Sequence, residues 1–125
     1  MPKQIVITAG STTVRAELND SATALAIRAA LPIEGRANRW GGEIYFTIDV
    51  EADLEDDARE VVEAGELAFW PLGRAFCVFF GSTPASSGSQ IRAASPVNVV
   101  GRVTEDLAPL WDVPDGARIS VGLVS

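Results

Sequence analysis

The chain has 125 residues, 47% of them apolar, which is enough to bury one hydrophobic core and leaves little room for a second domain. Its formal net charge of −7 argues against nucleic acid as a partner, because such binding depends on cations that neutralise phosphates. No segment approaches the roughly 18 consecutive apolar residues of a membrane span, and the first residues lack a basic region followed by an apolar run. We therefore expect a single soluble, cytoplasmic domain over residues 1–125 with no membrane partner, and the one cysteine, Cys77, agrees with a reducing compartment.

The first half of the chain is predicted to form two hairpins separated by a short helix. Residues 4–9 and 12–18 are rich in β-branched side chains and flank a Gly-Ser turn, as expected for a hairpin. Residues 22–30 are alanine-rich, follow good N-capping residues and end before a proline, which predicts a helix. Residues 33–40 and 43–48 then form the second hairpin around a Gly-Gly turn.

An acidic run follows the second hairpin. Nine acidic side chains and only one basic one, Arg59, lie between Asp49 and Glu66. Such a run predicts a solvated loop that keeps the protein soluble. Clustered carboxylates also suit calcium, but the Asp-x-Asx-x-Asx-Gly spacing of a calcium loop is absent. The sequence therefore predicts no metal site, with a calcium site as the alternative.

The second half of the chain is predicted to contribute further strands, a long loop and a second short helix. Residues 75–80 are apolar at every position, so this strand should lie at the centre of the sheet and be buried on both faces. Residues 81–90 are rich in Gly, Ser and Pro and form a surface loop that is either mobile or functional. The other expected elements are strands at residues 67–70, 97–103 and 118–124 and a short helical turn through residues 104–111. Many short strands with two short helices indicate a mainly β fold, a closed or nearly closed antiparallel barrel.

The absence of histidine narrows the possible chemistry. It excludes a Ser-His triad and removes the commonest imidazole metal ligand. The only lysine, Lys3, lies near the terminus, and no Asp or Glu stands within an apolar run in a way that indicates a raised pKa. Cys77 lies among apolar neighbours, so we expect a buried and unreactive thiol. We therefore predict no cofactor and leave enzymatic activity open.

Three aromatic residues are candidates for a ligand site. Trp40 and Trp70 stand beside turns at the ends of predicted strands, where the mouths of barrels bind ligands. Tyr45 also carries a polar tip on an apolar body. All three side chains suit the core of a small barrel equally well, so both roles remain open.

Four polar residues complete the candidate ligand site. Arg39 lies on the strand before the Gly-Gly turn, and Arg74 either clamps an anion or balances the acidic run on the surface. Gln90, after the long loop, either lines a groove or faces solvent. Asn98 lies between two valines and needs hydrogen-bond partners if buried, so it is either structural or a ligand contact.

Three strings of residues resemble those of a small prokaryotic cyclophilin-like family of unknown function. They are Trp40-Gly-x-Glu43-Ile-Tyr-Phe46, Gly65-(x)4-Trp70-Pro-x-Gly73-x-Ala75-x-Cys77-x-Phe79-Phe-Gly81-x-Thr83-Pro84 and Ser95-x-Val97-Asn-Val-x-Gly101. The resemblance spans most of the chain, and the expected order of strands and helices agrees with it. It implies a closed eight-stranded antiparallel cyclophilin-like barrel with a short helix near each end.

The resemblance implies less about activity. True cyclophilins are peptidyl-prolyl isomerases in which an arginine weakens the amide resonance of the prolyl bond. Their motifs, Phe-x-Arg and Phe-Met-x-Gln-Gly-Gly-Asp, have no match around residues 36–46, so no catalytic residue can be carried over. Arg36 and Arg39 occupy the corresponding region, and strand alternation sends them to opposite faces.

Two classes of function follow from these observations. The first is a binding module for a small molecule or an extended peptide at the barrel mouth, which we favour because strand-end aromatic residues are present and the isomerase motifs are absent. The alternative is a peptidyl-prolyl isomerase with non-standard active-site residues. A structural subunit recognised through a sheet edge is a third possibility. The sequence leaves the oligomeric state open.

Overall fold

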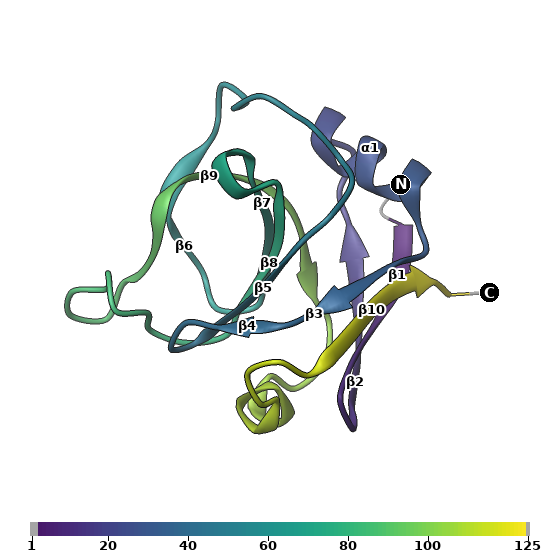
Figure 1. The fold of residues 1–125 in the computed structure, drawn as a ribbon. Coiled ribbons are helices and arrows are strands. Elements are labelled where there is room, and N and C mark those ends of the chain that lie inside the picture. Colours follow the sequence, from purple (N-terminus) through teal and green to yellow (C-terminus); the bar gives the residue numbers. More distant parts are fainter. Residues whose placement is uncertain (1–2, 125) are drawn as a thin grey trace.

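The computed structural model describes residues 3–124 as a mainly β fold with one α-helix (Figure 1). The strands and helices have the following bounds: β1 (Lys3–Ala9), β2 (Thr12–Leu18), α1 (Ala22–Ala30), β3 (Ile33–Arg36), β4 (Asn38–Arg39), β5 (Glu43–Thr47), β6 (Arg59–Val62), β7 (Glu66–Trp70), the 3₁₀ helix η1 (Pro71–Gly73), β8 (Ala75–Phe79), β9 (Ile91–Val103), the 3₁₀ helix η2 (Ala108–Asp112) and β10 (Arg118–Leu123). No helix in the described part of the chain is both long and apolar enough to cross a membrane.

The strands form one antiparallel sheet that is not closed into a barrel. Its order is β3-β10-β1-β2-β9-β7-β8-β5-β4, and β6 pairs with β9 beside this path. The expectation of a closed eight-stranded barrel is therefore wrong, since the described residues form a ten-stranded sheet whose end strands do not pair with each other. The expected short helical turn over residues 104–111 is present as the 3₁₀ helix η2, which begins later than predicted, at Ala108.

The two end strands of the sheet are the halves of one expected strand, which is split at Ala37. The Ala37 N–H donates to the carbonyl of Ala117, and its own carbonyl accepts from the N–H of Gly116, both at 2.7 Å. Residues before this point, in β3, pair with β10, whereas residues after it, in β4, pair with β5. The two ends of the sheet are thus consecutive pieces of chain that diverge toward different partners.

The first hairpin and the helix are present as the sequence predicts. In β1 and β2, alternate side chains are buried, so the apolar positions face the core and the polar ones face out. The Ser21 side chain caps α1 by accepting from the N–H of Ala24 at 3.2 Å. The helix buries Thr23, Ala24 and Ile27, which anchors it against the sheet.

One strand lies in a segment that was expected to be a loop, and another begins earlier than expected. The acidic run contains β6, which pairs with the first half of β9. Strand β9 starts at Ile91 rather than at residue 97 and contains Pro96, and its pairing with β6 shifts register there. A proline and an irregular ladder bend a strand. The bend lets β9 pair first with β6 and then with β7 and β2.

The central strands are buried on both faces and separate two apolar clusters. Strand β8 is buried at every position, as predicted, between β7 and β5. The larger cluster lies toward β1, β2, β10 and α1 and includes Phe46, Phe69 and Phe76. The smaller cluster lies on the opposite face, toward β6 and β9, and consists of Val62, Ala68, Ala75, Cys77, Phe79, Ala93 and Val97. Figure 1 shows the strands that surround it, β5 to β9, as a ring beside the rest of the molecule.

Candidate functional site

A cavity of about 220 Å³ opens onto the smaller cluster and is the candidate functional site. We call it the Glu43 cavity. Its lining residues are Trp40, Glu43, Tyr45, Trp70, Cys77, Ala93, Ala94 and Val97. A dry apolar cavity of about 150 Å³ is large enough for benzene. The Glu43 cavity therefore has the size of a small organic molecule.

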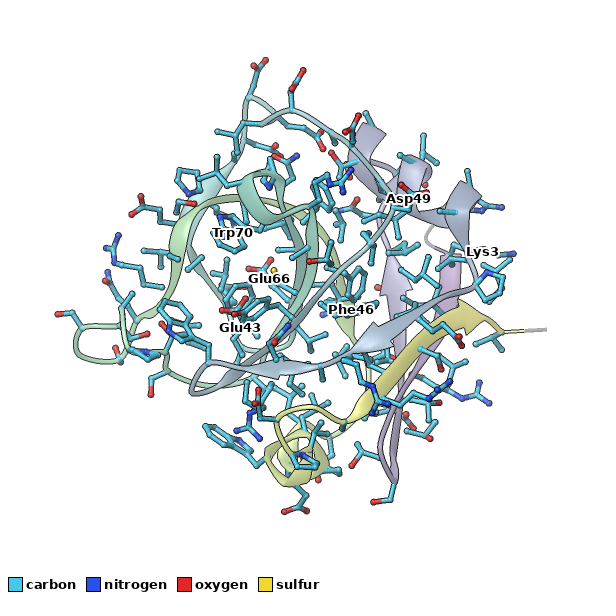
Figure 2. All side chains as sticks on the ribbon, in the orientation of Figure 1. Lys3, Glu43, Phe46, Asp49, Glu66 and Trp70 are labelled. Carbon is cyan, nitrogen blue, oxygen red and sulfur yellow. The ribbon has the colours of Figure 1, made fainter. Side chains whose placement is uncertain are left out.

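Strand alternation places the polar side chains of β5 in the cavity. Successive strand residues point to opposite faces, so Glu43 and Tyr45 face the cavity while Ile44 and Phe46 enter the larger cluster. Tyr45 pairs in register with Cys77 of β8. Figure 2 shows Glu43 and Trp70 inside the ring of strands and Phe46 on the side toward β1.

A tight turn fixes Trp40 next to Glu43 at the start of β5. The two residues exchange backbone hydrogen bonds, Trp40 N–H to Glu43 O at 3.0 Å and Glu43 N–H to Trp40 O at 3.2 Å. Gly41 has a φ of +62°, which favours glycine. A Cβ on Gly42 would lie 2.3 Å from the carbonyl carbon of Gly81. Both glycines are therefore required for the turn, and the turn sets the positions of Trp40 and Glu43.

Glu43 is a buried acid, with 6% of its surface exposed. Burial raises its pKa from 4.5 to about 7, because an ionised carboxylate loses its hydration there, and a hydrogen bond with the Cys77 thiol partly offsets this. Among residues 3–124, Glu43 forms no ion pair with an arginine or lysine. At neutral pH the carboxyl is thus close to half ionised, and the described residues supply it with no cation.

Cys77 is the buried thiol that its neighbours predict. Burial raises its pKa well above the usual value, and the charge of Glu43 and a hydrogen bond with that residue raise it further. A thiol of this kind stays protonated, and the thiolate is the reactive form. Cys77 therefore serves as a wall of the cavity rather than as a nucleophile, and its thiol donates to the carbonyl of Ala75 at 3.8 Å.

The aromatic walls of the cavity are held in fixed orientations. The rings of Tyr45 and Trp70 meet edge to face, with centroids 6.3 Å apart and planes at 86°. The Trp70 indole N–H donates to the Ser95 hydroxyl at 2.6 Å. This bond occupies the only donor of the indole, so Trp70 offers a ligand its ring surface.

Three of the seven predicted ligand-binding residues come together in the Glu43 cavity: Trp40, Tyr45 and Trp70. Arg39 lies elsewhere. Its guanidinium donates to the carbonyls of Gly41, at 3.0 Å, and Val113, at 2.6 Å, and lies 5.3 Å from the Phe80 ring centroid. Arg39 therefore ties the turn at the cavity to η2.

The other three predicted residues also lie outside the cavity. Arg74 forms a surface ion pair with Glu51 at 3.3 Å, in accord with its role in balancing the acidic run. Gln90 accepts a hydrogen bond from Arg92 at 3.4 Å in an exposed position. Asn98 is 1% exposed, and its side chain is hydrogen-bonded within the chain.

The side chain of Asn98 joins β9 to the acidic run and to α1. Its amide group donates to the carbonyl of Asp53 at 2.9 Å and to the Thr23 hydroxyl at 3.0 Å, and its oxygen accepts from the N–H of Glu55 at 2.8 Å. These bonds satisfy the buried amide within the chain. They also fix the path of a segment that the sequence describes only as solvated.

Sequence reasoning missed Glu43. The expectation that no acid has a raised pKa is wrong for this residue. A signal was present, because Glu43 alternates with Ile44, Tyr45 and Phe46 and so shares a strand face with an aromatic side chain. What covers that face is β6 and the early part of β9, which were not predicted as strands. The residues Ala93, Ala94 and Val97, which complete the cavity, come from the same region.

No group of three or more His, Cys, Asp or Glu side chains within residues 3–124 is arranged to hold a metal ion. The acidic side chains of the run are instead engaged in part by arginines. Glu66 pairs with Arg59 at 2.8 Å and Glu60 with Arg92 at 2.7 Å. The second of these pairs links β6 to β9 over the smaller cluster.

Comparisons with known proteins agree with this architecture. A family model described as cyclophilin-like matches residues 3–122. The solution structure of the hypothetical protein AF2241 from Archaeoglobus fulgidus is 41% identical, covers 98% of this chain and 95% of its own, and superimposes with a TM-score of 0.83. No curated protein matches the chain.

Proposed function

Because the chain belongs to the cyclophilin-like family, whose model covers nearly all of it, we propose that it is a binding module that holds a small molecule in the Glu43 cavity. One observation carries the proposal. A buried carboxyl with no cationic partner among the described residues lies in a cavity whose other walls are aromatic and aliphatic side chains and the Cys77 thiol. Concave apolar sites with a few convergent polar groups are typical of ligand binding.

The size of the cavity favours a small molecule over an extended peptide. Its volume, about 220 Å³, is below the roughly 300 Å³ at which ordinary ligand pockets begin. An extended peptide would need a groove that runs along several residues. We therefore narrow the ligand to a compact molecule that the cavity can surround.

The cavity offers less support for the isomerase alternative. Such an enzyme needs a donor that reaches the prolyl nitrogen, and no arginine is among the described residues that line the cavity. Arg39 donates to backbone carbonyls, and Arg36 donates to the carbonyl of Gly116 at 3.2 Å. We expect exchange spectroscopy on X-Pro peptides to show no acceleration by the protein. Faster cis/trans exchange that is lost in Arg36→Ala or Arg39→Ala would support the isomerase hypothesis.

The test of the proposal is a fragment screen by thermal shift with a blocked cavity as control. A ligand that binds only the folded state stabilises it by about 2.7 kcal/mol at a concentration of 100 times its Kd. Ala94 is exposed at the edge of the cavity, so Ala94→Phe should fill the entrance with little effect on the fold. Ala26→Phe is the matched control, because it makes the same substitution at an exposed position of α1, away from the cavity.

We expect some compact fragments to raise the melting temperature of the wild type and of Ala26→Phe but not of Ala94→Phe. Fragments that stabilise all three proteins equally would place binding outside the Glu43 cavity. If no fragment in a chemically diverse set stabilises the wild type, the binding proposal fails.

A further inference from the structure

We propose that the ligand of the Glu43 cavity is a small alkylated ammonium cation, held by the Glu43 carboxylate and by the rings of Trp40, Tyr45 and Trp70. This inference rests on the proposed binding function and names the chemical class of its ligand. The proposal follows from the charge, the walls and the hydrogen-bonding capacity of the cavity.

The charge of the cavity selects for a cation. Glu43 is the one charged side chain among the eight lining residues, and neither arginine nor lysine is among them. A buried carboxylate without a cationic partner is unfavourable, and a bound cation would supply that partner. An anionic ligand would instead place two like charges in the same apolar site. A neutral ligand would bring no compensating charge, so the carboxyl would keep its proton and the charge contact would not form.

The aromatic walls select for a cation with an apolar surface. Trp, Tyr and Phe rings attract cations electrostatically over their faces, and aromatic enclosures recognise quaternary ammonium groups in this way. Three of the eight lining residues are aromatic and come from different places in the chain: the turn before β5, β5 itself and the end of β7. Alkyl groups on the nitrogen would also fill the space beside Ala93 and Val97.

The limited supply of hydrogen-bond acceptors disfavours a primary ammonium. Such a group carries three N–H donors that each need an acceptor after it leaves water. The carboxylate of Glu43 and the hydroxyl of Tyr45 are the side-chain oxygens among the lining residues. The indole N–H of Trp70 is a donor and is already bonded to Ser95. An alkylated ammonium has fewer donors or none, so it fits these walls better.

The protonation of Glu43 couples to such a ligand. A cation beside the carboxylate favours its ionised form, so binding below neutral pH should release the proton that burial holds there. The other titratable groups that line the cavity are Tyr45 on β5 and Cys77 on β8. On the β6 and β9 side, each charged side chain has an ion-pair partner: Glu60 pairs with Arg92 at 2.7 Å, Arg59 with Glu66 at 2.8 Å and Arg102 with Glu17 at 3.3 Å.

The experiment compares choline with 3,3-dimethylbutan-1-ol, its neutral carbon isostere, by isothermal titration calorimetry on the full chain. The two probes have the same shape and differ in charge, so their ratio of affinities isolates the charge. We expect choline to bind at least about tenfold more tightly than the alcohol at pH 8, in line with the strength of desolvated cation–π and charge contacts.

The pH dependence gives a second readout from the same titrations. If the ionised form of Glu43 is the one that binds, a pKa of about 7 makes choline bind about 30-fold more tightly at pH 8 than at pH 5.5. Comparing the heat of choline binding in buffers of different ionisation enthalpy measures the number of protons released. This number should be close to one proton per bound choline at pH 5.5 and about 0.1 at pH 8. The alcohol should show no such dependence.

Two variants distinguish the effect of the Glu43 carboxylate inside the cavity from a general effect of the protein's net charge. Glu43→Gln keeps the shape of the side chain and should reduce the preference for choline to what the aromatic rings alone provide, and it should remove the pH dependence. Glu63→Gln removes one negative charge from an exposed glutamate outside the cavity and should leave both unchanged. Equal losses in the two variants would indicate a general effect of net charge and would overturn the proposal.

The outcomes distinguish failure of the cation inference from failure of the proposed binding function. If choline and the alcohol bind equally, and Ala94→Phe abolishes both, the cavity binds small molecules but the cation inference is wrong. If neither probe binds while neutral fragments stabilise the wild type, the cation inference is again wrong and the binding function stands. If no probe or fragment binds, the proposed function itself fails.

Discussion

Replacing Glu43 by glutamine should remove a pH-dependent loss of stability. In the wild type the Glu43 carboxyl has a pKa of 4.5 in the unfolded chain and about 7 in the folded chain, so folding raises its affinity for the proton. The stabilisation from this group is complete below pH 4.5 and disappears as the pH rises through 7. A tenfold change in proton affinity corresponds to about 1.4 kcal/mol, so about 2.5 kcal/mol should be lost between pH 5 and pH 8.

The assay is urea unfolding of the wild type, Glu43→Gln and Glu63→Gln at several pH values from 5 to 8. Glutamine does not titrate, so the free energy of unfolding of Glu43→Gln should fall less over this range, by about 2.5 kcal/mol, than that of the wild type. Glu63 is exposed, and Glu63→Gln should follow the wild type. A constant difference between the wild type and Glu43→Gln at every pH would refute the account of a buried acid.

Two other substitutions test the supports of the cavity. Asn98→Ala should lower the free energy of unfolding by about 2–4 kcal/mol, because the backbone groups of the acidic run that bond to Asn98 lose their partner. A loss below about 1 kcal/mol, measured by urea unfolding, would contradict this prediction. Gly42→Ala should cost about 1–3 kcal/mol, since its Cβ would lie 2.3 Å from Gly81, whereas Gly122→Ala, with no atom within 4 Å of its Cβ, should cost less. Equal effects at the two glycines would show that the turn can relax.

The elements with strong local signals were predictable from the sequence. Helix α1 has a capping serine, an alanine-rich body and a proline after its end, and its bounds match the prediction. The first hairpin and the buried strand β8 are encoded by β-branched and apolar residues at regular spacing. In each case the signal lies within the element, so no knowledge of the partner strand was needed.

The elements that depend on distant partners were not predictable in the same way. Strand β6 lies in an acidic run that is typical of a loop, and it becomes a strand because β9 pairs with it. The break at Ala37 follows from hydrogen bonds with residues about 80 positions later in the chain. The burial of Glu43 depends on β6 and β9, which cover the strand face on which it lies. The aromatic half of the site could thus be named from the sequence, and its acid could not.

The most direct test of the Glu43 cavity as the ligand site uses the three tryptophan indoles of the chain as reporters. Trp40 and Trp70 line the cavity, whereas Trp111 packs against Phe80 outside it, at 4.9 Å between ring centroids. In a ¹H–¹⁵N NMR titration with a fragment that stabilises the protein, the indole signals of Trp40 and Trp70 should shift and that of Trp111 should stay in place. A shift confined to Trp111, or no indole shift at saturation, would contradict the assignment of the ligand to this cavity.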